Sequence, residues 1–154
     1  MNEKDLVLEF ESAIKPTLSN HMYRAVSAKS SKRKSGYWAV LARTDGLKWY
    51  QGAMAEELKT TLPPEKVERF KYLFDTGVYD IEVSTTHYVY YKDYYEFDAS
   101  NLIKAHEDCV AKHLGIDDSK TCSYFVKKVP TEFKDVWKAV TVMKLVPKHP
   151  LLHM

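Results

Sequence analysis

Two kinds of apolar pattern alternate along this chain, and their order is the strongest constraint on its fold. Short segments rich in apolar and aromatic residues predict strands. Longer segments with apolar residues three or four positions apart predict helices. The predicted strands cover 6–10, 37–42, 78–84, 87–97, 121–129 and 137–146, and the predicted helices cover about 46–60, 65–74 and 101–113. The order ββααββαββ predicts an α/β fold, a two-layer mixed β-sheet with helices packed on one face.

The predicted helices have recognisable ends and inward faces. Thr44 or Asp45 can cap the first helix, because a side-chain oxygen there accepts an unpaired backbone N–H. Ser100 or Asp98 can cap the third, and Gly115 ends it. His106 is expected at the surface of that helix. The expected inward residues are Leu47, Tyr50 or Gln51, Met54 and Leu58 in the first helix, and Leu102, Ala105, Cys109 and His113 in the third.

Length and composition favour a single globular domain over residues 1–154. A chain of 154 residues fits one core, and 45% hydrophobic with 29% charged residues excludes a disordered chain. The polar N-terminus lacks a signal peptide, and no apolar run approaches the roughly 20 residues that span a bilayer. We therefore expect a cytoplasmic protein with no membrane partner, in which Cys109 and Cys122 are free, mostly buried thiols.

Positive charge is concentrated locally although the net charge is only +2. Lys29, Lys32, Arg33 and Lys34 form a cluster, and no acidic residue lies between Met22 and Thr44. Such a cluster is either a solvated loop or an arm that contacts DNA phosphates. The tyrosines of 87–97 offer a similar choice, since they can fill a core or stack on unpaired bases. These tyrosines are Tyr88, Tyr90, Tyr91, Tyr94 and Tyr95.

A polar row runs along one side of the third predicted helix. Asn101, Lys104 and Asp108 are spaced i, i+3 and i+7, so they lie above one another and away from the apolar stripe. In a purely structural interpretation, Lys104 and Asp108 form a surface ion pair. In the functional one, Lys104 faces a phosphate and stabilises charge that develops in a reaction.

Carboxylates flank this helix on both sides. Asp98 precedes it, and Asp117 and Asp118 follow it. If both ends lie near strand termini, these oxygens can converge on Mg²⁺, a cation that binds few protein oxygens and keeps several waters. The metal would then activate water against a phosphodiester. Otherwise, Asp98 is a helix cap and the Asp pair is a turn.

Three segments together resemble a known family. Segment 97–104 (FDASNLIK), then Asp108 and segment 115–119 (GIDDS), resembles the RusA-like Holliday junction resolvases. The pattern of that family reads Asp-x-Asp-Asn-x-x-Lys, an Asp four residues on, and an Asp-Asp pair. Segment 16–24 (PTLSNHMYR) is similar to the early Pro-x-x-Ser-Asn-x-x-Tyr loop of the family. The resemblance covers most of the chain.

The resemblance implies a homodimeric, Mg²⁺-dependent endonuclease, with Mn²⁺ as a possible substitute, that nicks two strands of a four-way DNA junction. A two-fold dimer would match the near two-fold symmetry of the junction. A bacteriophage origin is consistent with this family. The implied metal-binding carboxylates are Asp98 and Asp118, with Asp117 beside them; Lys104 is the implied catalytic cation, and Asn101 positions the metal or phosphate. The expected DNA-binding residues are Asn20, Arg24, Lys29, Lys32, Arg33 and Lys34.

One departure from the family pattern is Ser100, which stands where the family has its second Asp. A hydroxyl is a poorer Mg²⁺ ligand than a carboxylate, so three interpretations stay open. Ser100 acts through a water, beside an exposed helix N-terminus. Glu96, on the same predicted strand face as Asp98, or Asp108 replaces the missing charge, which is the interpretation we favour. Alternatively, the site is weakened and the protein binds junctions without cutting them efficiently. A separate hypothesis, which does not use the resemblance, is an unrelated interaction module in which the acidic residues form caps and turns.

Overall fold

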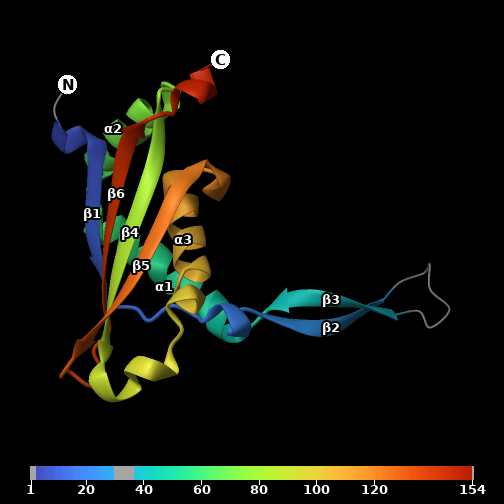
Figure 1. The fold of residues 1–154 in the computed structure, drawn as a ribbon. Coiled ribbons are helices and arrows are strands. Elements are labelled where there is room, and N and C mark those ends of the chain that lie inside the picture. Colours follow the sequence, from blue (N-terminus) through green and yellow to red (C-terminus); the bar gives the residue numbers. More distant parts are fainter. Residues whose placement is uncertain (1–2, 30–36, 154) are drawn as a thin grey trace.

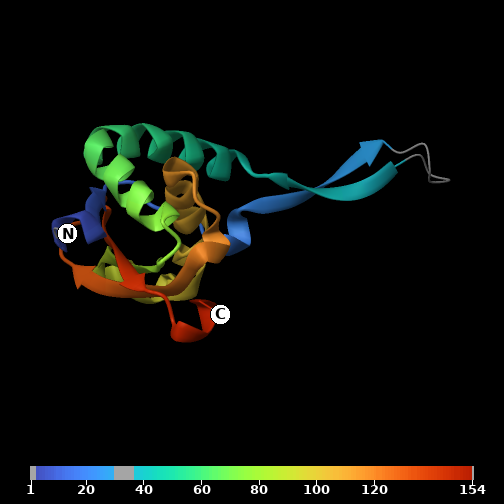
Figure 2. The same cartoon turned by 90° about the horizontal axis from the view of Figure 1, so that it is seen from above.

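The chain folds into a sheet covered on one face by helices, in a computed structural model that describes residues 3–29 and 37–153 (Figure 1). The sheet has the strand order β1-β6-β4-β5. Its strands are β1 (Val7–Ser12), β4 (Tyr79–Tyr90), β5 (Thr121–Thr131) and β6 (Lys138–Pro147). The covering helices are α1 (Asp45–Thr61), α2 (Pro64–Asp75) and α3 (Lys104–Leu114), which lie together on one side of the sheet (Figure 2). The predicted two-layer α/β class is confirmed.

Strand directions determine where the ends of α3 lie. β1 and β4 both pair antiparallel with β6, whereas β4 and β5 are parallel neighbours. A parallel pair needs a crossover connection, and α3 supplies it. The helix therefore runs back along the sheet, from the end of β4 to the start of β5 (Figure 1).

The core lies where α1 packs on the sheet. Leu47, Tyr50, Met54 and Leu58 are all buried, so the predicted inward stripe of α1 is confirmed with Tyr50 rather than Gln51. Burying a leucine side chain contributes about 1.5–3 kcal/mol. The N-terminus of α1 is capped by Thr44, whose Oγ1 accepts a hydrogen bond from the backbone N of Leu47 at 3.3 Å. Phe70 and Leu73 add the inward face of α2.

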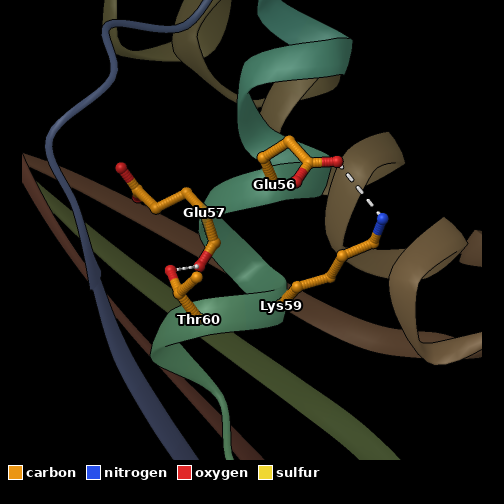
Figure 3. Close-up of polar contacts among 4 residues, drawn as sticks. All are labelled: Glu56, Glu57, Lys59 and Thr60. Carbon is orange, nitrogen blue, oxygen red and sulfur yellow. Dashed lines mark hydrogen bonds and ion pairs between the residues drawn. The ribbon is translucent and has the colours of Figure 1, made fainter.

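Polar contacts near the C-terminal end of α1 include local ones on its outer face (Figure 3) and one long-range bond, in which Glu57 Oε2 accepts from the backbone N of Ala13 at 3.3 Å. Lys59 Nζ lies 3.2 Å from Glu56 Oε1 in an exposed ion pair. Thr60 Oγ1 donates to the carbonyl of Glu57 at 2.9 Å. Exposed pairs of this kind contribute little to stability. This face therefore keeps α1 solvated and offers no obvious site.

One long strand replaces the two strands predicted over 78–84 and 87–97. β4 continues from Tyr79 to Tyr90, and the chain then turns into the 3-10 helix η3 (Tyr91–Glu96). Lys128 holds this turn, because its Nζ donates to the carbonyls of Tyr94 at 2.7 Å and Phe97 at 2.6 Å. The expectation that Glu96 and Asp98 share a strand face is therefore wrong.

A second sheet stands apart from the two layers. β2 (Tyr23–Lys29) and β3 (Tyr37–Arg43) form an antiparallel ribbon that projects away from the rest of the molecule (Figures 1 and 2). β3 agrees with the strand predicted over 37–42, whereas no strand was predicted over 23–29. The predicted DNA-binding residues Lys32, Arg33 and Lys34 lie outside the described residues.

Short 3-10 helices complete the chain, and they are η1 (Glu3–Leu6), η2 (Ser19–His21), η4 (Ala99–Leu102), η5 (Asp118–Lys120) and η6 (Pro150–His153). α3 thus begins three residues later than predicted. Gly115 ends it in the left-handed conformation, with φ 66°, as predicted. Cys109 and Cys122 are free, although Cys122 is exposed rather than buried. Among the described residues, no helix has the length and apolar character needed to cross a bilayer.

Candidate functional site

Four predicted site residues gather where α3 begins, and we call Asp98, Ser100, Asn101 and Lys104 the Asp98 end. The backbone carbonyl of Asp98 accepts a hydrogen bond from Asn101 N at 3.0 Å, which starts the turn of η4. The Asp98 carboxylate makes no cap bond to this turn. Asp98, Ser100 and Lys104 are all exposed. Asp98 occupies the cap position without capping, so its carboxylate can face a ligand.

The early segment 16–24 packs against the Asp98 end. Ser19 Oγ donates to the carbonyl of Asn101 at 3.2 Å, across 82 positions of sequence. Lys15 lies close by, with its Nζ 4.1 Å from the centre of the Phe97 ring. The ribbon leaves the body directly after η2, so its root lies beside this end as well (Figure 1). Two of the three segments that carry the family resemblance, 16–24 and 97–104, are therefore neighbours in space.

The predicted polar row continues one turn further along α3. Lys104 Nζ lies 3.0 Å from Asp108 Oδ1, and the two side chains are 52% and 29% exposed. An ion pair this accessible adds little stability. It keeps a lysine and a carboxylate on the outer side of the helix. Asp108 is thus engaged with Lys104 rather than beside Asp98.

A buried polar chain fixes the position of α3 beneath this row. His106 Nδ1 lies 3.2 Å from the Tyr50 hydroxyl, and His106 Nε2 lies 2.8 Å from Thr141 Oγ1. Thr141 continues the chain to Thr85 at 3.1 Å, and Thr85 continues it to the hydroxyl of Tyr124 at 3.2 Å. The prediction that His106 is a surface residue is wrong. Its bonds tie α3 to α1 and to the sheet, which holds the outer row in one place.

Burial keeps two histidines neutral in the core. Desolvation, together with the nearby His87, lowers the pKa of His106 from 6.5 to about 3. Desolvation also lowers the pKa of His87 to about 4. The two rings lie 6.0 Å apart, and neither nitrogen of His87 has a hydrogen-bond partner in the part of the chain that the structure describes. Both histidines are fully covered, so they support the fold instead of touching a ligand.

The acidic pair lies at the other end of α3, which we call the Asp118 end. Asp117 Oδ1 accepts a hydrogen bond from Ser119 N at 3.0 Å, and its carbonyl accepts one from Lys120 N at 3.0 Å. Asp118 begins η5 directly before β5, and its side chain is outside what the structure describes. Asp117 therefore forms a turn, as the structural interpretation of the Asp117–Asp118 pair predicted.

The Asp98 and Asp118 ends do not meet within one chain. The 11 residues of α3 separate them by about 16 Å at ~1.5 Å per residue. β5 gives a similar result. Lys128 of β5 binds the carbonyl of Phe97, next to the Asp98 end, and Thr121 of β5 directly follows the Asp118 end. Seven residues of extended strand separate Lys128 from Thr121, a distance of about 23 Å at ~3.3 Å per residue. The prediction that both flanks of the helix converge in one chain is wrong. A crossover helix between parallel strands has one end near the C-terminal ends of the strands and the other near their N-terminal ends.

The same separation bears on metal binding. Among the described side chains, which exclude that of Asp118, no three His, Cys, Asp or Glu residues lie close enough together to hold a metal ion.

Comparison with known proteins does not assign a family. The sequence matches no protein-family model and no curated protein. The RusA-like resemblance therefore stays a prediction that rests on segments 16–24, 97–104 and 115–119 and on Asp108.

Some residues that shape this region were not predicted from the sequence. Lys128 fixes η3 and the approach to Asp98, yet its sequence context is an ordinary basic strand. His87 shares its alternation with Ile81, Val83 and Thr85, so its burial could have been predicted from a strand that continues through 79–90. At the ribbon root, Arg43 donates to Gln51 Oε1 at 2.7 Å, which joins β3 to α1.

Proposed function

We propose that this protein binds branched DNA through the β2–β3 ribbon and, as a homodimer, cuts it in a Mg²⁺-dependent reaction at the Asp98 end. The observation that carries the proposal is the projecting ribbon beside that end (Figures 1 and 2). Between Met22 and Thr44 the sequence has six Lys or Arg residues and no Asp or Glu. Such a concentration of charge on a protruding element favours a polyanion as its partner.

The ribbon has the shape and charge that duplex DNA accepts. A two-stranded β-ribbon fits the major groove of B-DNA. Its seven-residue strands extend about 23 Å at ~3.3 Å per residue, enough to follow a groove or backbone across several base pairs. Phosphate contacts by lysine and arginine supply affinity without sequence preference. A ribbon of this type suits a protein that selects DNA by shape.

Residues at the Asp98 end suit phosphodiester cleavage. The exposed carboxylate of Asp98 would bind Mg²⁺ together with Asp118, which would supply charge neutralisation and an activated water. Lys104, one turn from Asn101, would face the phosphate that the ribbon root brings alongside. Positive charge at that point stabilises the charge that develops in the transition state.

A second copy of the chain is required to complete this site. β5 is an edge strand, since it has β4 as its only neighbour in the four-stranded sheet. Two β5 edges that pair antiparallel about a two-fold axis would set the two α3 helices antiparallel. Each Asp98 end would then lie alongside the partner's Asp118 end. In this proposal, the dimer overcomes the separation that α3 imposes within one chain.

Binding without cleavage is a second candidate, and two observations favour it. Ser100 replaces a carboxylate of the family pattern, and the 11 residues of α3 lie between the Asp98 end and the Asp118 end within one chain. A protein of this kind would still use the ribbon to hold a junction. The two candidates differ in whether a metal changes the DNA.

A cleavage assay separates them. The full chain is incubated with a labelled four-way junction and with a linear duplex, in Mg²⁺ or in EDTA. The proposal predicts paired nicks in the junction with Mg²⁺ and none with EDTA. Tight junction binding without product supports the second candidate. Equal affinity for both DNAs contradicts both.

Neutralising the basic segment between β2 and β3 in the sequence should weaken binding to any DNA. Replacing Lys32, Arg33 and Lys34 with serine removes up to three phosphate contacts, so the slope of log affinity against log salt should become shallower by about 2–3. Fluorescence anisotropy with a labelled duplex from 50 to 200 mM salt measures this slope. The matched control removes three exposed lysines from the body, Lys66, Lys112 and Lys144. An equal change in the control would show that general charge, not the ribbon, carries the binding.

A further inference from the structure

An exposed aromatic ring lies three residues before Asp98. Tyr95 is 92% exposed and belongs to η3, and Tyr91 in the same element is 53% exposed. Exposed apolar side chains are informative where they gather rather than where they stand singly, and these two tyrosines lie in one six-residue element. Tyr88, Tyr90 and Tyr94 are only partly exposed by comparison.

The ring of Tyr95 contacts the ring of Tyr94. It packs edge-on against Tyr94, with the ring centres 5.1 Å apart at an angle of 90°. Tyr94 in turn lies on Lys128, whose Nζ is 4.4 Å from the centre of its ring. The same Lys128 Nζ donates to the carbonyls of Tyr94 and Phe97. Lys128 thus holds Tyr94 against β5, and Tyr94 supports one edge of the exposed Tyr95 ring.

The surroundings of Tyr95 favour a base over a phosphate. Within three residues of Tyr95 the sequence has three carboxylates, Asp93, Glu96 and Asp98, and one cation, Lys92. Negative carboxylates repel phosphates, whereas a nucleobase is uncharged and presents a flat face. Bases stack on aromatic side chains with little sequence preference. Bases are accessible in this way where strands separate, as at the centre of a branched DNA.

We propose that Tyr95 stacks on the exposed face of a base that has lost its stacking neighbour at the branch point, next to the strand that Asp98 faces. This inference rests on the proposed function, because it assumes that branched DNA reaches the Asp98 end. It deepens that function by naming the element that distinguishes a branch from a continuous duplex. The ribbon grips phosphates of any duplex, and Tyr95 adds affinity only where a base has left its stack.

Anisotropy in EDTA tests the stacking without cleavage. Tyr95→Ala should lower the affinity for a four-way junction and for single-stranded oligothymidine by ~5- to 100-fold. It should leave the affinity for a continuous linear duplex unchanged. Tyr95→Phe keeps the ring and should retain wild-type affinity. Tyr72→Ala is the matched control, since Tyr72 is 63% exposed on α2, away from η3. 2-Aminopurine placed at the branch should be quenched by the wild type and not by Tyr95→Ala.

Other outcomes overturn the inference. Equal loss on junction and smooth duplex, or equal loss in Tyr95→Phe and Tyr95→Ala, means that the ring does not stack on unpaired bases. A change in molecular mass of Tyr95→Ala by light scattering assigns the surface to contacts between copies of the chain. If the wild type binds junctions and Tyr95→Ala binds them equally well, only the stacking fails. If the wild type shows no affinity for branched DNA, the proposed function fails with it.

Discussion

Asp98→Asn and Asp118→Asn should each lower the rate of junction cleavage by ~100-fold or more, while junction affinity changes little. The reason is that a metal ion at phosphate supplies several kcal/mol of transition-state stabilisation, and a tenfold rate change corresponds to about 1.4 kcal/mol. Lys104→Ala should have a similar effect, because its charge acts mainly on the transition state. Single-turnover nicking in Mg²⁺ and anisotropy in EDTA measure the two properties separately. Parallel loss of binding would contradict the assigned roles.

Mixing the two inactive variants tests whether the site is shared between protomers. In a mixed dimer of Asp98→Asn with Asp118→Asn, one shared site carries both substitutions and the other carries neither. With free subunit exchange, about a quarter of the wild-type sites should be restored, and each mixed dimer should nick only one strand. A site built within one chain gives no restoration, because every site then carries one substitution.

A matched control addresses general loss of charge. Glu68 is exposed on α2, and Glu68→Gln removes one negative charge without touching either end of α3. It should cleave at the wild-type rate. A loss comparable to that of Asp98→Asn would indicate that cleavage depends on overall charge and not on the proposed carboxylates.

The protein should lose stability steeply as the pH falls below 6.5. His106 and His87 have folded-state pKa values of about 3 and about 4, below the value of 6.5 for an exposed histidine. Between these limits the unfolded chain binds more protons than the folded one. Stability is therefore fully present above pH 6.5 and is lost on acidification until the folded-state pKa is reached.

The expected size of this loss is large. Each histidine contributes about 1.4 kcal/mol per pH unit, so the pair removes roughly 5 kcal/mol between pH 6.5 and 4.5. This is comparable to the whole free energy of unfolding of a small domain, about 5–15 kcal/mol. Urea denaturation followed by circular dichroism at several pH values measures the slope.

His87→Phe identifies the source of the acid sensitivity. Neither nitrogen of His87 has a hydrogen-bond partner among the described residues, so a phenyl ring can fill its place without removing a bond. The slope of unfolding free energy against pH from 6.5 to 4.5 should fall by about half, because His106 alone remains. An unchanged slope would mean that other groups cause the acid unfolding.

Much of the body of the fold could be predicted because its residues repeat a burial pattern. The stripe Leu47, Tyr50, Met54 and Leu58 has helical spacing, and Thr44 and Gly115 have the chemistry of helix ends. β2 was not predicted, since it pairs only with β3 in a ribbon that stands clear of the core. A strand that buries no face against a core leaves no alternation in the sequence. The tyrosines of 91–96 favoured a strand, but Lys128 holds them in a turn from a distant position.

The candidate site could be predicted only in part. The polar row Asn101, Lys104 and Asp108 follows from helical spacing, and Lys104 pairs with Asp108 on the outer side. The positions of Asp98 and Asp118 depend on strand direction, and residue spacing does not reveal that β4 and β5 run parallel. Likewise, the burial of His106 depends on Tyr50 and Thr141, which are remote in sequence and supply its hydrogen bonds.

Thr44 joins the ribbon to α1. Its backbone N donates to the carbonyl of Met22 at 2.9 Å, its Oγ1 donates to that of His21 at 2.7 Å, and it caps the helix through Leu47 N. These hydrogen bonds join the base of the ribbon to the first turn of α1, so α1 sets the direction in which the ribbon leaves the body. A force on the ribbon is carried into a helix whose Tyr50 contacts His106 of α3. A change in the angle between the β2–β3 ribbon and the body would therefore either move α1 or break the hydrogen bonds of Thr44.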